Sequence, residues 1–439
     1  MEQPSDMKKH RYPSLRVWVR HLSVAGVALH VLSTHAADWP QWRGENRDGH
    51  ASAHAPTIAS LPKDVKPVWK MAIGPGFSSP IVAGGKLIYL DAQDGQEVVH
   101  AVTAVRGQEL WKTPFAQAES DEWGSGPRST PFAEGDRVYV QSMDGHFRCL
   151  NLADGKVLWS APFEKYGIRF STKSAEGTAA RRGNNGSGIV DGDFVYVPVG
   201  AKGASTVCFD KRTGQEIWKA GDDEAAYASL LVATLAGQKQ LVAFTADALT
   251  GLDLKTGRAL WRMPFKTNAK RHAATPVIDG DTVTVNSQTI GLVRVKITKT
   301  TDGFSATEAW ANKPLTINLA TPVLAGGHLY SYGPIRTKDY VCVEAATGAL
   351  KWTQSGFGIG KDQTDYASSI VVGKNILLLT YDGQLVLIAA NPEKFTELGR
   401  LQVCGKTWVH PALADGKLYV RDGRDLLCLD LTTSPVAAR

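Results

Sequence analysis

Short runs of alternating apolar and polar residues recur along most of this chain, and Gly, Asp, Asn and Pro separate them. The stretch between residues 129 and 159 is representative. It contains four such runs, Ser129–Ala133, Arg137–Gln141, Phe147–Asn151 and Lys156–Trp159, with turn pairs such as Asp144-Gly145 between them. Alternation with a period of two is typical of half-buried β-strands. The pattern therefore predicts repeated four-stranded antiparallel units and almost no helix.

A fixed motif closes these units. A glycine stands four residues before a tryptophan in five places: Gly107 and Trp111, Gly155 and Trp159, Gly214 and Trp218, Gly257 and Trp261, Gly348 and Trp352. Trp69 and Trp310 belong to the same series without that glycine, and the repeat length is about 47 residues, which is the length of a propeller blade. Each tryptophan would stand on an outer strand and cover the next blade.

The first strands give the number of blades. Eight of them begin near Ser79, Ser129, Gly188, Ser229, Thr275, Thr321, Ser368 and His410. The last unit ends on a third strand, 426–431, whereas Pro67–Lys70 is a fourth strand with nothing before it. Pairing these two open edges closes the ring. We therefore predict an all-β, eight-bladed β-propeller of four-stranded antiparallel blades, closed by the N-terminal strand. A seven-bladed ring stays open because the seventh unit has lost its tryptophan motif.

The N-terminal segment has the pattern of an export signal. Lys8, Lys9, Arg11, Arg16 and Arg20 precede an apolar stretch, 22–32, and the small-residue site Thr34-His35-Ala36. This pattern predicts a cleaved signal peptide and a periplasmic or secreted protein; an uncleaved tail is the alternative. The first cysteine is Cys149, so no lipid-anchor cysteine lies near the cleavage site. The predicted divisions are a signal peptide (1–36), an N-terminal strap (37–65), the propeller (66–434) and a tail (435–439).

The strap opens with Asp38-Trp-Pro-Gln-Trp-Arg-Gly44. Two tryptophans flanking a proline favour a segment anchored across the propeller by packing, with Arg43 near the rim; ligand stacking is the alternative.

The remaining composition excludes several classes of protein. The formal net charge of +6 falls by 3 if residues 1–36 are removed, which argues against a general nucleic-acid binder. Cys149, Cys208, Cys342 and Cys428 occupy matching third-strand positions, which favours free, buried thiols over disulfides. The chain has no C-x-x-C, H-E-x-x-H or G-x-S-x-G motif, so no metal site and no hydrolase set is predicted.

The candidate ligand site is the mouth of the central channel. In a four-stranded blade, the loops between blades share a face with the loops joining second and third strands. The candidate ligand-binding residues on these loops are Arg128, Arg182, Asn185, Arg271, Arg336, Asp365, Tyr366, Trp408 and His410. Converging arginines would suit an anionic ligand, but the sequence favours the alternative that they are solvated loop charges. The insertion 165–188 is interpreted either as a flap over this mouth or as a loop without a function.

The blade pattern [Ala/Leu]-x-x-[Thr/Asp]-Gly-x-x-x-Trp resembles the tryptophan-docking repeat of the pyrroloquinoline-quinone (PQQ) propeller superfamily, over roughly residues 66–434. The resemblance implies one of two branches. One contains the quinoprotein alcohol and sugar dehydrogenases, which hold PQQ and usually Ca²⁺ on the propeller axis. The other contains the BamB-type scaffolds of outer-membrane protein assembly, which have no cofactor. The adjacent cysteine pair of many dehydrogenases is missing here, and no matching calcium set can be identified.

The leading hypothesis is therefore an exported, cofactor-free, monomeric propeller that acts as a scaffold and not as an enzyme. Its expected partner is a protein or polysaccharide at the cell envelope. One alternative is a divergent PQQ-dependent alcohol or sugar dehydrogenase using PQQ with Ca²⁺. The other is a carbohydrate-binding or carbohydrate-active propeller, which the loop aromatics Trp123, Tyr227, Tyr366 and Trp408 favour.

Overall fold

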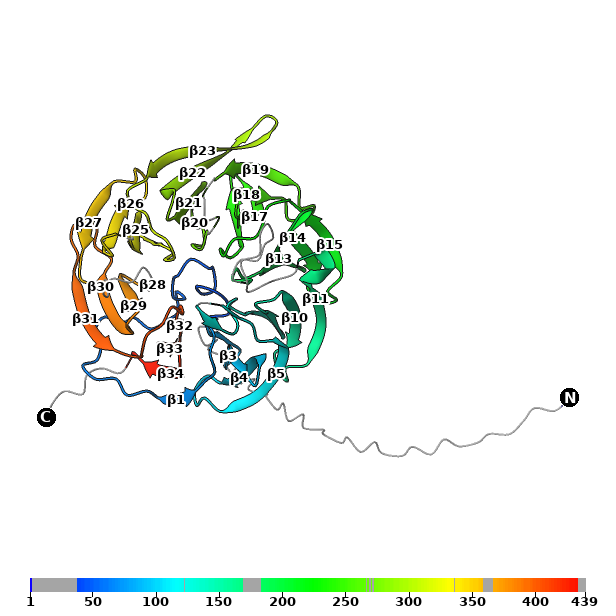
Figure 1. Ribbon diagram of the computed structural model, residues 1–439, viewed down its shortest axis with the longest axis horizontal. Coiled ribbons are helices and arrows are strands. Elements are labelled where there is room, and N and C mark those ends of the chain that lie inside the picture. Colours follow the sequence, from blue (N-terminus) through cyan, green and yellow to red (C-terminus); the bar gives the residue numbers. More distant parts are fainter. Residues whose placement is uncertain are drawn as a thin grey trace. The chain divides into compact units, whose positions relative to one another are not determined.

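Eight four-stranded antiparallel sheets surround a common axis as the blades of a propeller (Figure 1). The computed structural model describes Met1 and residues 38–432, apart from 122, 169–182, 266, 268, 269, 271, 335 and 358–365. The predicted signal peptide and tail therefore lie outside the described residues, apart from Met1. The prediction of eight blades is confirmed, and the seven-bladed alternative is wrong because the seventh unit forms four paired strands.

The strands follow the chain around the ring. Blade 1 consists of β2 (Ile81–Ala83), β3 (Lys86–Gln93), β4 (Gln96–Thr103) and β5 (Glu109–Gln117), and blade 2 of β8 (Phe132–Glu134), β9 (Arg137–Gln141), β10 (His146–Asn151) and β11 (Val157–Pro162). Blade 3 consists of β12 (Ile189–Asp191), β13 (Phe194–Ala201), β14 (Ala204–Asp210) and β15 (Glu216–Ala220). Blade 4 consists of β16 (Leu231–Leu235), β17 (Gln238–Phe244), β18 (Ala248–Leu252) and β19 (Ala259–Pro264).

Blade 5 consists of β20 (Val277–Asp279), β21 (Thr282–Ser287), β22 (Gly291–Thr300) and β23 (Gly303–Asn312), and blade 6 of β24 (Val323–Ala325), β25 (His328–Tyr332), β26 (Tyr340–Glu344) and β27 (Leu350–Gln354). Blade 7 consists of β28 (Ala367–Val372), β29 (Asn375–Thr380), β30 (Gln384–Ala389) and β31 (Glu397–Gln402). Blade 8 consists of β32 (Ala412–Ala414), β33 (Lys417–Arg421), β34 (Asp425–Asp430) and β1 (Trp69–Ala72). Two minor elements, the 3₁₀ helix η1 (Phe163–Tyr166) and the ribbon of β6 (Ser120–Asp121) and β7 (Gly124–Ser125), lie outside the blades.

The last blade is completed by the start of the propeller. Strand β1 pairs with β34, with Trp69 opposite Cys428, so blade 8 takes its outer strand from the N-terminal side of blade 1. This pairing confirms the predicted closure. It gives the otherwise open edge of β34 a partner, which removes one site for pairing with another chain.

Burial explains why the inner and outer strands have different sequences. The middle strands are packed between neighbouring blades on both faces, so β29 and β30 are nearly continuous runs of Leu, Ile and Val. The outer strands have one face in solvent and therefore alternate. In β15 only Trp218 is buried, between exposed Ile217 and Lys219.

Five tryptophans of the series pack on a glycine turn of the following blade. The indoles of Trp69, Trp111, Trp159, Trp218 and Trp310 cover Gly107, Gly155, Gly214, Gly257 and Gly348. A Cβ on Gly214 would lie 2.6 Å from the Trp159 ring, and the residue has a φ of +73°, so the turn favours glycine for two reasons. The Trp159 indole N–H also donates to the Lys211 carbonyl at 3.1 Å. The exception is Trp261, whose indole donates to Gln240 of its own blade.

The cysteines behave as the sequence predicts. Cys149, Cys208, Cys342 and Cys428 are free and buried, and each lies opposite the tryptophan of its own blade's outer strand. Burial raises the pKa of the Cys149 and Cys208 thiols to about 12. These thiols stay protonated at neutral pH and are poor nucleophiles.

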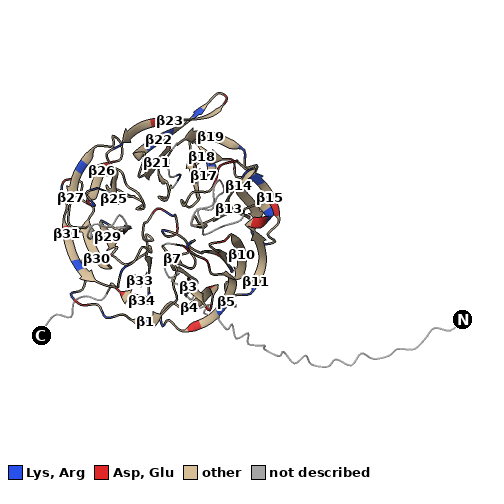
Figure 2. Cartoon of the chain, in the orientation of Figure 1, with Lys and Arg blue, Asp and Glu red and all other residues tan. Residues whose placement is uncertain are grey.

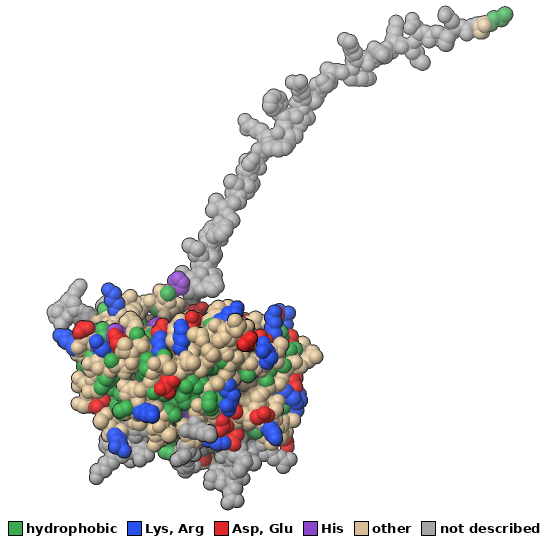
Figure 3. Space-filling model, turned by 90° about the horizontal axis from the view of Figure 1, so that it is seen from above, with side chains coloured by type: hydrophobic (Ala, Val, Ile, Leu, Met, Phe, Trp, Pro, Cys, Tyr) green, Lys and Arg blue, Asp and Glu red, His purple; other side chains and the backbone are tan. Residues whose placement is uncertain are grey.

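Many of the Lys, Arg, Asp and Glu residues lie on the outer strands of the ring (Figure 2). On the side seen in Figure 3, basic and acidic side chains are interspersed. That side therefore offers no uniformly basic surface to a nucleic-acid backbone. Within the described residues, no helix has the length and apolarity needed to cross a membrane.

Candidate functional site

The segment after the predicted signal fills the centre of the propeller. Residues 38–51, here called the axial plug, pass through the middle of the ring, where Figure 1 shows them in dark blue. The plug contacts the innermost part of all eight blades, through Val82, Ala133, Gly188, Leu230, Thr275, Pro322, Val371 and His410 in blade order. Strand β1 thus closes the ring by completing blade 8, and the plug links the blades to one another along the axis.

Two arginines hold the plug in place. The Arg47 guanidinium is buried and donates to the carbonyls of Ser187 (3.2 Å), Leu230 (2.8 Å) and Gly188, while its Nε donates to Gln41. Arg43 is also buried and donates to Pro322 O at 2.9 Å. The expectation that Arg43 lies near the rim is wrong, because blade carbonyls on the axis provide acceptors there. Burial lowers the pKa of Arg47 to about 9, so it remains charged at neutral pH.

A pocket of about 350 Å³ lies at the end of the channel beside the plug. Its wall takes residues from all eight loops that enter the first strands and from the β21–β22 turn: Phe77, Ser79, Trp123, Arg128, Thr130, Asn185, Tyr227, Ser229, Ala273, Thr275, Gln288, Asn318, Leu319, Tyr366 and Trp408, with Trp42 from the plug. We call it the mouth pocket. The loops between blades and a loop joining second and third strands therefore meet on one face, as the blade geometry implies.

Aromatic rings form one side of the mouth pocket. Trp408 stacks with Phe77 and with Tyr381, at 5.7 Å between ring centres in each case, and Trp123 lies tilted against it at 5.5 Å. The Arg128 guanidinium lies over the Phe77 ring at 5.3 Å. Trp123 remains 41 % exposed, and Trp42 is half-buried. The rings support one another and still leave apolar surface for a ligand.

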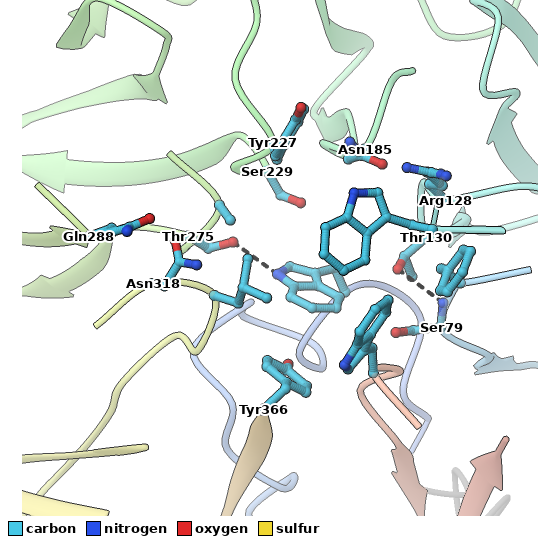
Figure 4. A pocket seen from close by; sticks show the side chains of 16 residues that line it. Ser79, Arg128, Thr130, Asn185, Tyr227, Ser229, Thr275, Gln288, Asn318 and Tyr366 are labelled. Carbon is cyan, nitrogen blue, oxygen red and sulfur yellow. Dashed lines mark hydrogen bonds between the residues drawn. The ribbon is translucent and has the colours of Figure 1, made fainter. Parts of the chain in front are cut away.

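Among the described residues, the polar side chains of the mouth pocket are neutral with the exception of Arg128. Figure 4 shows Gln288, Thr275 and Asn318 on one side of the space, with Arg128 and Asn185 on the other and Ser229 and Tyr227 between them. Arg128 is the one charged residue among the described lining residues, and it pairs with Asp121 at 2.6 Å. Burial raises the pKa of Tyr366 to about 12, so its hydroxyl stays protonated.

The hydroxyls at the blade entrances join adjacent blades. Ser187 donates to Thr130 O at 2.8 Å, and the Thr275 amide donates to the Thr321 hydroxyl at 3.1 Å. The Thr275 hydroxyl in turn accepts from the Trp42 indole at 2.9 Å, the dashed line at the centre of Figure 4. These bonds fix the positions of the lining loops before any ligand arrives, which reduces the entropy cost of binding.

The nine sequence-predicted site residues fall into three groups: four that line the mouth pocket, two that lie elsewhere, and three outside the described residues. Arg128, Asn185, Tyr366 and Trp408 line the mouth pocket, whereas Arg336 is exposed and is not part of the wall. His410 lies behind the plug and packs against Trp39 and Trp42. Burial lowers the pKa of His410 to about 3, so it is a neutral packing residue. Arg182, Arg271 and Asp365 lie outside the described residues, as does most of the insertion 165–188.

Sequence reasoning missed several lining residues, including Trp42, Phe77, Ser229, Thr275 and Gln288. A signal was available for some of them. A Ser or Thr precedes Pro at the first strands of four blades, at Ser79, Thr130, Thr275 and Thr321, and three of these hydroxyl residues line the pocket.

The described residues do not fit PQQ and Ca²⁺ on the propeller axis. A calcium site needs several oxygen ligands, usually including carboxylates. No group of three or more His, Cys, Asp or Glu residues in the described part of the chain could hold a metal ion. The plug also occupies the axis itself, through Arg47 and Trp42.

The ring of blades and its docked tryptophans define the class as a PQQ-like β-propeller. The sequence matches the family described as outer membrane protein assembly factor BamB over residues 56–220 and 97–354, more than half of the chain, and the chain belongs to that family. A comparison with curated proteins finds no match.

Solved structures show the same fold at low identity. BamB from Moraxella catarrhalis is 12 % identical with a TM-score of 0.54, covering 84 % of this chain and 99 % of that one. The computationally designed Ika8 protein is 10 % identical with a TM-score of 0.56, covering 85 % and 100 %. Quinohemoprotein alcohol dehydrogenase from Comamonas testosteroni is 14 % identical with a TM-score of 0.47, covering 92 % and 82 %. At such identities the likeness concerns the fold and not the ligand.

Proposed function

We propose that this protein is a cofactor-free binding propeller of the cell envelope, which holds a protein or polysaccharide partner at the mouth pocket. The observation that carries the proposal is the axial plug. Cofactor-dependent members of the superfamily hold PQQ on the axis, and here the chain's own residues 38–51 run along that axis.

The chemistry of the mouth pocket supports binding over catalysis. A general acid or base works best with a pKa near the operating pH. Arg128 is held by Asp121, and burial raises the pKa of Tyr366 to about 12. Neither residue is suited to transfer a proton at neutral pH.

The shape of the pocket also supports binding. Concave, largely apolar sites with a few fixed polar groups are where proteins usually hold ligands. Aromatic residues such as Trp123 and Trp42 supply large contact areas at low entropy cost. Because the ring closes within one chain, we expect a monomer.

The envelope location rests on two observations. The basic and apolar pattern of residues 8–32 is that of an export signal. The family description refers to outer-membrane protein assembly, which takes place in the envelope.

Calorimetric titration of PQQ, with and without Ca²⁺, tests the cofactor-free part of the proposal. We expect no saturable heat under either condition, because no group of three or more His, Cys, Asp or Glu residues in the described part of the chain could hold the Ca²⁺ and residues 38–51 run along the axis. Stoichiometric, calcium-dependent binding would contradict the proposal. Dye reduction with alcohols and sugars in the presence of PQQ and Ca²⁺ would then identify a dehydrogenase.

A further inference from the structure

We infer that the mouth pocket recognises a carbohydrate, namely one or more sugar units of a neutral oligosaccharide or polysaccharide. This inference rests on the proposed binding function and specifies its ligand class. It is carried by the combination of exposed aromatic surface with neutral polar side chains that both donate and accept hydrogen bonds.

The aromatic surface suits the ring of a sugar. One face of many pyranose rings presents C–H groups, which pack on the π-face of an indole or phenol. Two segments supply such surface to the mouth pocket, since Trp123 comes from the loop between blades 1 and 2 and Trp42 comes from the plug. Hydrogen bonding to Thr275 fixes the Trp42 ring in advance.

The polar side chains suit sugar hydroxyls. Each hydroxyl of a sugar is both a donor and an acceptor, and so is the side chain of each Asn, Gln, Ser and Thr. The amides of Gln288 and Asn318 lie on one side of the space in Figure 4, and the amide of Asn185 lies on the other. Within the described part of the chain, the side chains of Gln288 and Asn318 make no hydrogen bonds to protein, so they are available to a ligand.

The charge of the described lining residues favours a neutral ligand. Asp121 compensates Arg128 at 2.6 Å, and that arginine also covers the Phe77 ring. An anionic ligand would have to compete with this carboxylate for the guanidinium. The cavity of about 350 Å³ is at the small end for ligand sites, and it corresponds to on the order of one or two sugar units.

A proline-rich peptide is the main competing ligand, because aromatic clusters also bind such segments. Such a peptide presents mostly carbonyl acceptors and few donors. It would leave the acceptor oxygens of Gln288, Asn318 and Asn185 without partners. Polar groups left unpaired on binding cost affinity, so the lining favours a sugar.

Titration of the full chain with four neutral tetrasaccharides tests the inference: β-linked glucose, α-linked glucose, β-linked N-acetylglucosamine and mannose. We expect at least one of them to bind. We expect Asn318→Ala and Gln288→Ala each to weaken its affinity by about tenfold. Trp123→Ala should weaken it more than Trp123→Phe, which retains an aromatic face. The control is Val105→Ala, at an exposed position in the turn between β4 and β5, which should bind like the wild type.

The possible results separate this inference from the proposed function. If none of the four sugars binds, or if Asn318→Ala, Gln288→Ala and Trp123→Ala all bind unchanged, the carbohydrate inference is overturned. Binding of a proline decapeptide in place of sugars, with the same loss in the variants, would overturn it and leave the binding function intact. Sugar binding accompanied by PQQ-dependent oxidation of that sugar would support carbohydrate recognition and overturn the cofactor-free function. Thermal melts of each variant show whether it is folded.

Discussion

Replacing Arg47 by Ala is expected to lower the free energy of unfolding by about 4 kcal/mol. The Arg47 guanidinium is buried on the axis and serves the carbonyls of Ser187, Gly188 and Leu230 at the entrances of blades 3 and 4. Alanine would leave these carbonyls without a donor in a space that solvent does not reach. Each unsatisfied buried group costs about 1–3 kcal/mol. Denaturant unfolding followed by tryptophan fluorescence measures the loss.

Two further variants make this prediction specific to the plug. Arg106→Ala removes an exposed arginine from the turn between β4 and β5 and should change stability by less than about 0.5 kcal/mol. Arg47→Lys keeps the charge but loses the planar fork, so it should fall between the wild type and Arg47→Ala. Equal unfolding midpoints for Arg47→Ala and Arg106→Ala would show that the plug does not hold the ring together.

The second large effect concerns pH. Glu97 is fully buried in blade 1, where the Met143 amide donates to its carboxyl group at 3.1 Å. Burial raises the pKa of Glu97 from 4.5 to about 8. Between these two values the unfolded chain loses the proton and the folded chain keeps it. Stability is therefore fully present below pH 4.5 and falls as the pH rises to about 8. We expect a loss of about 4 kcal/mol relative to Glu97→Gln across this range.

The difference between the wild type and Glu97→Gln isolates this group from every other titrating residue. Glutamine has nearly the same shape and cannot ionise, so the variant should lack this part of the pH dependence. Glu109→Gln, at an exposed position in β5, should keep the wild-type slope. Parallel stability curves for the wild type and Glu97→Gln between pH 4.5 and 8 would contradict the prediction.

The fold could be predicted from sequence because its determinants are local. Each blade is coded by alternation within strands and by a glycine turn that receives the preceding tryptophan, as for Gly214 and Trp159. Even the degenerate seventh unit keeps the strand-turn-strand rhythm that forms β30 and β31. The closure could be predicted because the sequence has two unpaired edges. The N-terminal strand is a fourth strand without a blade of its own, and the last blade lacks a fourth strand, so the two pair with each other.

The plug could not be predicted because its determinants are tertiary. Arg43 and Arg47 look like solvated loop charges until the ring supplies carbonyl acceptors from blades far away in sequence. The same holds for His410, which appears polar in sequence and becomes a neutral packing residue between plug and blade 8.

The mouth pocket could be predicted in part. Blade geometry correctly places Arg128, Asn185, Tyr366 and Trp408 on one face, because that face follows from strand order. Blade geometry does not give the distance of a side chain from the axis. For this reason Arg336 is among the predicted site residues, although it is exposed and is not part of the pocket wall. It also left out Trp42, because a strap residue has no place in the blade repeat.

Site-specific photocrosslinking in the cell envelope tests the central claim that the mouth pocket is where this propeller binds. A benzophenone side chain replaces either Leu319, which lines the pocket and is exposed, or Val105 in the turn between β4 and β5. Benzophenone inserts into C–H bonds of protein and sugar alike. We predict a discrete adduct from position 319, lost when Asn318→Ala and Trp123→Ala are combined with it, and no adduct from position 105. An adduct from position 105 with none from position 319 would contradict the claim.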